Sequence, residues 1–169
     1  MSQHVAHDIG PLVGDEACHA HFVASFTHRT TDRLMRMVHL FDEARVAVCS
    51  VHSPLATRSE LDWAEVPRWP LVVNTASGTT GPWSWPAGEG PKTIVETTNF
   101  DEWLESVAAD RGIGVIPDVA ERRNIHPGVR FVALRGAPTS PVSIAFLPRA
   151  RNAVLRRFVE AALESAQHV

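Results

Sequence analysis

NFDEWLESVAADRGIGVIP, residues 99–117, is the stretch of this chain that decides the fold. Asn99 can accept a hydrogen bond from the backbone N–H of Glu102, whose side chain can reach back as in a capping box. Apolar residues then recur at helical spacing and form a single stripe. These residues are Phe100, Trp103, Leu104, Val107 and Ala108. The first half of the stretch therefore predicts an amphipathic helix that begins after Asn99.

The second half of the stretch predicts a turn and a short buried strand. Residues 110–112, Asp-Arg-Gly, end the helix, because Asp and Gly tolerate the left-handed backbone that a helix end often needs. The apolar run at 113–116 is too short for a helix and suits a buried strand. Gly114 lets another backbone or a ligand approach closely. Pro117 ends the strand because it cannot donate to the ladder.

Apolar runs and turn residues predict that strands alternate with helices along the rest of the chain. The expected strands are 21–26, 45–51, 71–73, 93–97, 129–134 and 142–147, and the further expected helices are 59–66, one that begins at Asp118, and 151–166. Residues 75–90 are rich in Gly, Pro, Ser, Thr and Trp and predict a loop with one poor helical turn. Residues 1–36 show no sustained period. Such an alternation predicts a parallel or mixed sheet with helices on its faces.

The composition is that of an ordinary globular domain. The chain has 169 residues, of which 44% are apolar and 21% charged, so a core needs no disulfide staples. A net charge of −3 with a single lysine, Lys92, does not indicate the basic surface that nucleic-acid-binding proteins have. Cys18 and Cys49 are too few for a disulfide framework and indicate reduced thiols in a cytoplasm. The sequence shows neither a secretory signal nor an apolar run that could span a membrane.

The sequence predicts no catalytic residue, metal site or cofactor. It has no G-x-S-x-G elbow and no P-loop. The glycines at 112 and 114 follow a helix, whereas a dinucleotide fingerprint precedes one. Six early side chains could be metal ligands, but their spacing fits no tetrahedral zinc pattern. They are His4, His7, Cys18, His19, His21 and His28. Trp83 and Trp85 either stack on an aromatic ligand or, more commonly, cover a protein surface.

Five ordered blocks between residues 38 and 166 resemble the effector-binding domain of LysR-type transcriptional regulators. VHLFDEARVAVCSVHSPLATR, residues 38–58, is similar to the family's L..E.RV.V...HPLA.R block, with Ser53 where histidine is usual. The opening stretch is similar to D..L..VAAGRGIG..P, with Asp110 where glycine is common. The other blocks are WAEVPRWPLVV at 63–73, HPGVRFVAL at 126–134, and the strand and helix at 142–166.

The resemblance implies an α/β fold, a Rossmann-like lobe of the type 2 periplasmic-binding-protein-like fold with an incomplete second lobe. Residues 1–37 would be a poorly patterned N-terminal remnant. Residues 38–133 would be lobe two with the first crossover strand, and residues 134–169 the return to lobe one. The family's helix-turn-helix does not precede residue 38, so the sequence is interpreted as a regulator truncated at its N-terminus.

The resemblance also implies that a small organic acid, including aromatic acids, binds between the lobes. The lobe-two wall would come from the loop after strand 71–73 and from the end of strand 93–97. The matching residues are Thr75, Ser77, Gly78, Thr79, Thr97, Thr98, Asn99 and Phe100. Hydroxyls and the N–H groups of a helix start bind carboxylates. For each of these residues alone, a role in a cap, the core or a loop is the simpler interpretation.

The function implied is that of an effector-sensing domain that modulates transcription in the cytoplasm, without enzymatic activity. Its partners would be the small-molecule effector and a second copy in a homodimer. No association with a membrane is expected. Nucleic acid would be bound by the full-length regulator and not by this chain. Two alternatives stay open, a stand-alone solute-binding protein of the same fold and a small α/β enzyme. A signal peptide with an uninterrupted first lobe would favour the former, and a buried titratable cluster in a cleft the latter.

Overall fold

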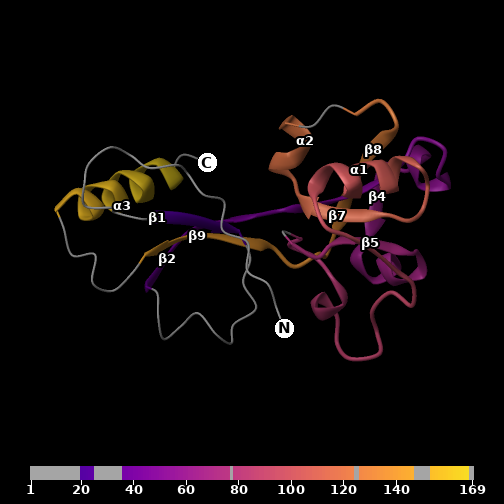
Figure 1. The fold of residues 1–169 in the computed structure, drawn as a ribbon, viewed down its shortest axis with the longest axis horizontal. Coiled ribbons are helices and arrows are strands. Elements are labelled where there is room, and N and C mark those ends of the chain that lie inside the picture. Colours follow the sequence, from indigo (N-terminus) through magenta and orange to yellow (C-terminus); the bar gives the residue numbers. More distant parts are fainter. Residues whose placement is uncertain (1–19, 25–35, 77, 124–125, 147–152, 168–169) are drawn as a thin grey trace. The chain divides into compact units, whose positions relative to one another are not determined.

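The computed structural model describes residues 20–24, 36–76, 78–123, 126–146 and 153–167 (Figure 1). The chain divides into two compact units, one made of residues 43–140 and the other of residues 2–42 together with 141–169. The six early histidine and cysteine side chains considered as metal ligands lie outside the described residues or side chains.

The 43–140 unit is built on a four-stranded sheet in the order β4-β8-β3-β7. β3 runs antiparallel to both β7 and β8, and β8 runs parallel to β4. The strands are β3 (Arg45–Ser50), β4 (Glu60–Asp62), β7 (Gly114–Pro117) and β8 (Val129–Arg135). The mixed sheet predicted from the alternating pattern is therefore confirmed.

Two further strands pair in parallel beside this sheet. β5 (Leu71–Asn74) pairs with β6 (Ile94–Thr97), and an isolated bridge between Leu71 and Ile113 joins β5 to the start of β7. Parallel neighbours need a long crossover connection. Here the connection is the predicted Gly- and Pro-rich loop, and it holds the predicted helical turn, η3 (Pro82–Ser84).

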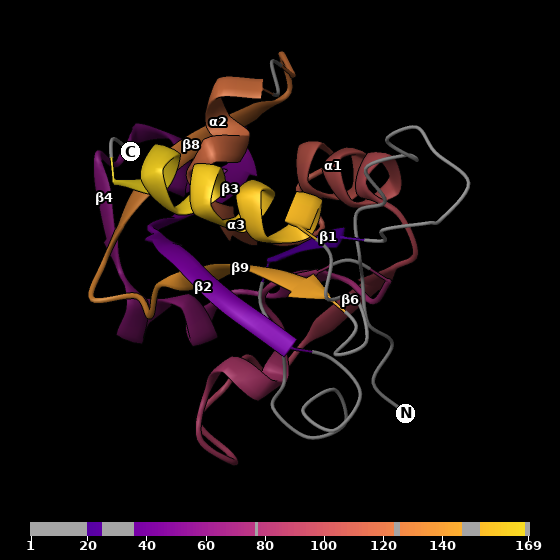
Figure 2. The same cartoon turned by 90° about the vertical axis from the view of Figure 1, so that its left-hand side faces the viewer.

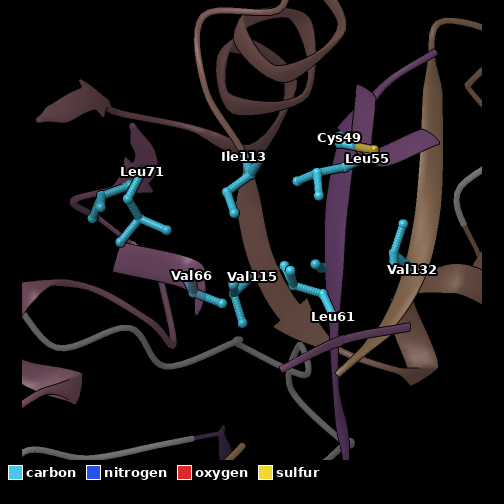
Figure 3. Packing of buried hydrophobic residues seen from close by; sticks show 10 residues of the cluster. Cys49, Leu55, Leu61, Val66, Leu71, Ile113, Val115 and Val132 are labelled. Carbon is cyan, nitrogen blue, oxygen red and sulfur yellow. The ribbon is translucent and has the colours of Figure 1, made fainter. Parts of the chain in front are cut away.

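The central strands of this unit are buried on both faces. In β3, Ala47 and Cys49 belong to one core cluster and Val48 to a second cluster. Successive side chains of a strand point to opposite faces, so the two clusters cover the two faces of the sheet. Figure 3 shows the first cluster, with Cys49, Leu71 and Ile113 among its labelled side chains. Burial on both faces explains why these strands read as unbroken apolar runs.

α1 (Phe100–Ala108) begins and ends as the sequence predicts. The Asn99 side chain accepts a hydrogen bond from the Glu102 N–H at 2.8 Å, and Asp110 adopts a φ of 56° just after the helix. The Glu102 carboxylate reaches back to Thr98, whose N–H donates to it at 2.8 Å, and not to Asn99. The predicted capping box is thus displaced by one residue.

Trp103 fixes α1 against the sheet. Its indole N–H donates to the Val72 carbonyl at 2.9 Å. Its ring lies so close to Gly114 that a Cβ at that position would come within 1.9 Å of a ring carbon. The group that approaches Gly114 is thus an aromatic side chain, and not the backbone or ligand expected from the sequence.

The prediction of a helix at 59–66 is wrong. Its residues form β4 and then a 3-10 helix, η2 (Trp63–Arg68). The Arg135 guanidinium on β8 donates to the Asp62 carboxylate of β4 at 2.6 and 2.7 Å and lowers the pKa of that carboxyl group. Pairing with β8 outweighs the local cap signal, as tertiary context often overrides helix propensity.

Short helices follow two strands of the unit, and the second lies where the sequence predicts a helix that begins at Asp118. η1 (Pro54–Thr57) follows β3, and the Ser53 side chain accepts a hydrogen bond from the Leu55 N–H at 3.3 Å. α2 (Val119–Arg123) follows β7. No helix in the described part of the chain is long and apolar enough to cross a membrane.

The other unit contains a three-stranded sheet in the order β1-β9-β2. β1 (Ala20–Ala24) pairs antiparallel with β9 (Ser140–Phe146), and β2 (Arg36–Glu43) lies on the other side of β9. Figure 2 shows α3 (Ala153–Ala166) beside this sheet. The sequence predicts β1, β9 and α3 to within a few residues. It misses β2, because none of its residues is buried and the strand shows no clear apolar alternation.

Replacing Gly114 by alanine should destabilise the protein, because the new methyl group would collide with the Trp103 ring. Overpacking of this kind costs about 1–3 kcal/mol, to be measured by urea unfolding. Gly90→Ala is the matched control, since its Cβ would make ordinary contacts, the nearest at 3.5 Å. That variant should stay within about 0.5 kcal/mol of the parent. Equal losses in the two variants would contradict the Trp103–Gly114 contact.

The Cys49 thiol should resist alkylation in the folded protein. It is fully buried, and burial together with the nearby Asp110 charge raises the pKa of the thiol to about 11. A raised pKa lowers the fraction of reactive thiolate at every pH below it. In a Cys18→Ser background, maleimide labelling at pH 8 should be slow in buffer and fast in urea. Fast labelling in buffer would show that β3 is not covered on this face.

Candidate functional site

The candidate site lies where β5 and β6 end. The two strands are parallel and in register, with Asn74 opposite Thr97 at their carboxyl ends. Thr75 continues the contact, because its N–H and its Oγ1 both donate to the Thr97 carbonyl, at 2.8 and 3.0 Å. In open α/β sheets, ligands bind beyond the carboxyl ends of parallel strands. The structure therefore brings Thr75 and Thr97, two of the predicted residues, together at this position.

The two threonines differ in what they offer a ligand. Thr97 is buried, and its Oγ1 donates to the Val73 carbonyl at 3.2 Å. This hydroxyl therefore stabilises the sheet and is not offered to a ligand. Thr75 is exposed. Because its hydroxyl hydrogen is donated to Thr97, its oxygen remains free to accept from a ligand.

The loop after β5 is folded tightly on Asn74. The Asn74 Oδ1 accepts from the Ala76 N–H at 3.0 Å, and the Asn74 carbonyl accepts from the Gly78 N–H at 2.8 Å. A Cβ at Gly78 would lie 2.3 Å from the Asn74 oxygen, so glycine is required for this turn. Ser77, which the sequence also places in the site, lies outside the described residues.

The start of α1 supplies the second half of the predicted wall. The Thr98 N–H and Oγ1 both donate to the Glu102 carboxylate, at 2.8 and 3.1 Å, while Asn99 caps the helix. Phe100 is half-buried and stacks on Trp103, with ring centroids 5.5 Å apart. Thr98 and Asn99 thus serve the helix cap here, and the Glu102 carboxylate places a negative charge beside the free N–H groups of the helix start.

Arg45 is a charged residue of this region that the sequence interpretation missed. It is only 7% exposed, and its guanidinium bonds to two segments far away in the chain. Nε donates to the Pro138 carbonyl at 2.9 Å, and Nη1 donates to the Thr79 carbonyl and Oγ1, at 3.1 and 3.2 Å, and to the Thr80 hydroxyl. Burial lowers the pKa of Arg45, which the charge of Glu43 partly opposes.

A sequence signal for Arg45 was present. It is the one charged residue of the otherwise apolar run RVAVCSV at 45–51. A charge in a strand expected to be buried on both faces requires polar contacts. The nature of those contacts could not be read from the sequence, because they lie in Thr79, Thr80 and Pro138.

The tryptophans considered as a ligand platform do not pair with each other. Trp85 stacks on Trp63 with ring centroids 4.3 Å apart and packs against the core, whereas Trp83 is 53% exposed. The buried Trp85 indole N–H has no hydrogen-bond partner among the described residues. Within the same described part of the chain, no group of three His, Cys, Asp or Glu side chains could hold a metal ion.

Comparison with known structures shows the fold of this chain in other proteins. A full-length BenM variant aligns with a TM-score of 0.67 and 16% identity, over 88% of this chain and 51% of BenM. The effector-binding domain of QuiR in complex with shikimate aligns with a TM-score of 0.69 and 14% identity, over 87% and 72% of the two chains. The BenM effector-binding domain with benzoate gives 0.62 and 16%, over 88% and 68%. The chain thus spans about half the length of full-length BenM.

Sequence comparison gives the family directly. The family model described as the LysR substrate binding domain matches residues 13–167, nearly the whole chain, while no curated protein sequence matches. The structural neighbours share a two-lobe, periplasmic-binding-protein-like α/β fold. The chain therefore belongs to the LysR substrate binding domain family and has the α/β fold of that family.

Proposed function

We propose that this chain senses a small organic acid, which binds at the carboxyl ends of β5 and β6, and that binding modulates transcription by the regulator that contains it. The observation that carries the proposal is the meeting of Thr75, the Gly78–Thr79 turn and the start of α1 at these strand ends. The similar domains of QuiR and BenM were described with shikimate and benzoate, both carboxylates.

The chemistry of the wall suits an acid with an apolar body. The first N–H groups of a helix have no intrahelical acceptor, and together with the helix dipole they favour an anion. At α1 the Glu102 carboxylate already lies beside them, so a bound acid would compete with it. The exposed Thr75 hydroxyl offers a polar contact, and the half-buried Phe100 ring offers an apolar surface for a ring. Such a combination of an apolar surface with a few placed polar groups is typical of small-molecule sites.

The remaining parts of the proposal follow from the family. We place the domain in the cytoplasm, where DNA-binding regulators act, and we expect it to form homodimers. Recognition of DNA is assigned to other parts of such a regulator, and no enzymatic step is included. The division into a lobe two at 38–133 and a return to lobe one at 134–169 is kept as part of this proposal, and the pairing of β1 with β9 adds residues 20–24 to the second part.

Benzoate or shikimate should bind the protein, and Thr75→Val should weaken that binding. The loss of one neutral hydrogen bond at the strand ends should lower affinity by roughly threefold to tenfold, as measured by isothermal titration calorimetry. Thr93→Val is the matched control, because Thr93 is equally exposed but precedes β6 at the opposite end of the strand.

Two results would contradict the proposal. The first is the absence of heat or thermal stabilisation with every acid tested. The second is an equal loss of affinity in Thr75→Val and Thr93→Val, which would place the ligand away from the carboxyl ends of the strands.

A further inference from the structure

Arg45 holds a buried positive charge that lacks an ion pair. Its four hydrogen bonds go to neutral oxygens, namely two carbonyls and two threonine hydroxyls. Among the described residues, no carboxylate lies within ion-pair distance of its guanidinium. Taking a charge out of water is unfavourable unless a counter-charge accompanies it. The nearby charge of Glu43 offsets the burial of Arg45 only in part, so an anion at the guanidinium would be favoured.

The guanidinium also has donors to spare. It carries five N–H groups in a fixed plane, and the bonds to Pro138, Thr79 and Thr80 use only Nε and Nη1. Nη2 makes no hydrogen bond with the described residues. Because four acceptor oxygens hold the plane in place, the orientation of Nη2 is fixed before any ligand arrives.

A second unused donor lies two residues along the chain from Pro138, one of the acceptors of Arg45. Ser140 is fully buried, and its hydroxyl has no hydrogen-bond partner in the described part of the chain. Buried polar groups are nearly always paired, and an unpaired one calls for an explanation such as a missing ligand. Ser140 stands two residues after Pro138, whose carbonyl accepts from the Arg45 Nε. Both donors thus belong to the 43–140 unit, and the segment 138–140 connects them.

We propose that Arg45 Nη2 and Ser140 Oγ form the carboxylate-binding subsite of this domain. One oxygen of the ligand would accept from the guanidinium, and the other would accept from the hydroxyl. Guanidinium–carboxylate bonds are among the strongest in proteins. Thr79 and Thr80 connect this subsite to the loop after β5. The inference rests on the proposed function, to which it adds the residues that select an acid over a neutral analogue.

The test compares an acid with its uncharged counterpart, using benzoate and benzamide as probes in calorimetry. The parent protein should prefer benzoate. Arg45→Gln should lower benzoate affinity by about tenfold to a hundredfold, the range for hydrogen bonds to charged groups, and leave benzamide unchanged. Arg45→Lys should retain part of the preference. Arg130→Gln is the control, because Arg130 is exposed on β8 of the same unit.

Ser140→Ala gives a test that does not depend on Arg45. The variant removes a hydroxyl that is unpaired in the ligand-free protein, so stability should be equal or higher. Benzoate affinity should nevertheless fall by roughly twofold to tenfold. A purely structural serine would give the opposite pattern, a loss of stability with unchanged affinity. Protection of the Cys49 thiol serves as the folding check for every variant.

The outcomes separate the inference from the function on which it rests. If benzoate binds the parent protein but Ser140→Ala and the folded Arg45 variants keep the full preference for the acid, the subsite is wrong and acid sensing stands. If neither benzoate, shikimate nor acetate stabilises the parent protein, both the subsite and the proposed acid effector are wrong.

Discussion

The position of the candidate site depends on the contact between the Trp103 ring and Gly114. This contact holds α1 on the sheet. The hydrogen bond from the Trp103 indole to the Val72 carbonyl fixes the position of the helix along β5. The start of α1 then lies at the carboxyl end of β6, since only Thr98 and Asn99 separate the two elements. A larger residue at 114 would move the helix and the site together.

Local patterns in the sequence predicted most of this unit, because its strands and its longest helix carry their own signals. Asn99 and Asp110 mark the ends of α1 by side-chain capping and a left-handed backbone, which are properties of single residues. β4 was missed because a strand of three residues has no period to detect. It is held by Arg135 of β8, and no local rule connects these segments.

The candidate site was predicted less completely for the same reason. The sequence placed Thr75 and Thr97 at the ends of neighbouring strands, and the structure brings them into contact. It could not indicate that the Thr97 hydroxyl is used within the sheet, or that Glu102 accepts from Thr98. Arg45 illustrates the limit most clearly, because its acceptors lie 34, 35 and 93 residues away in the chain.

The topology of β3 has a consequence for how the protein is made. β3 is the central strand of its sheet, yet both of its neighbours, β7 and β8, come much later in the chain. During synthesis, an apolar strand that is buried on both faces in the native fold must therefore wait without hydrogen-bonded neighbours. Strands in this state are prone to pair with other chains. Slow translation or high temperature should therefore increase aggregation during synthesis, before β7 and β8 have paired with β3.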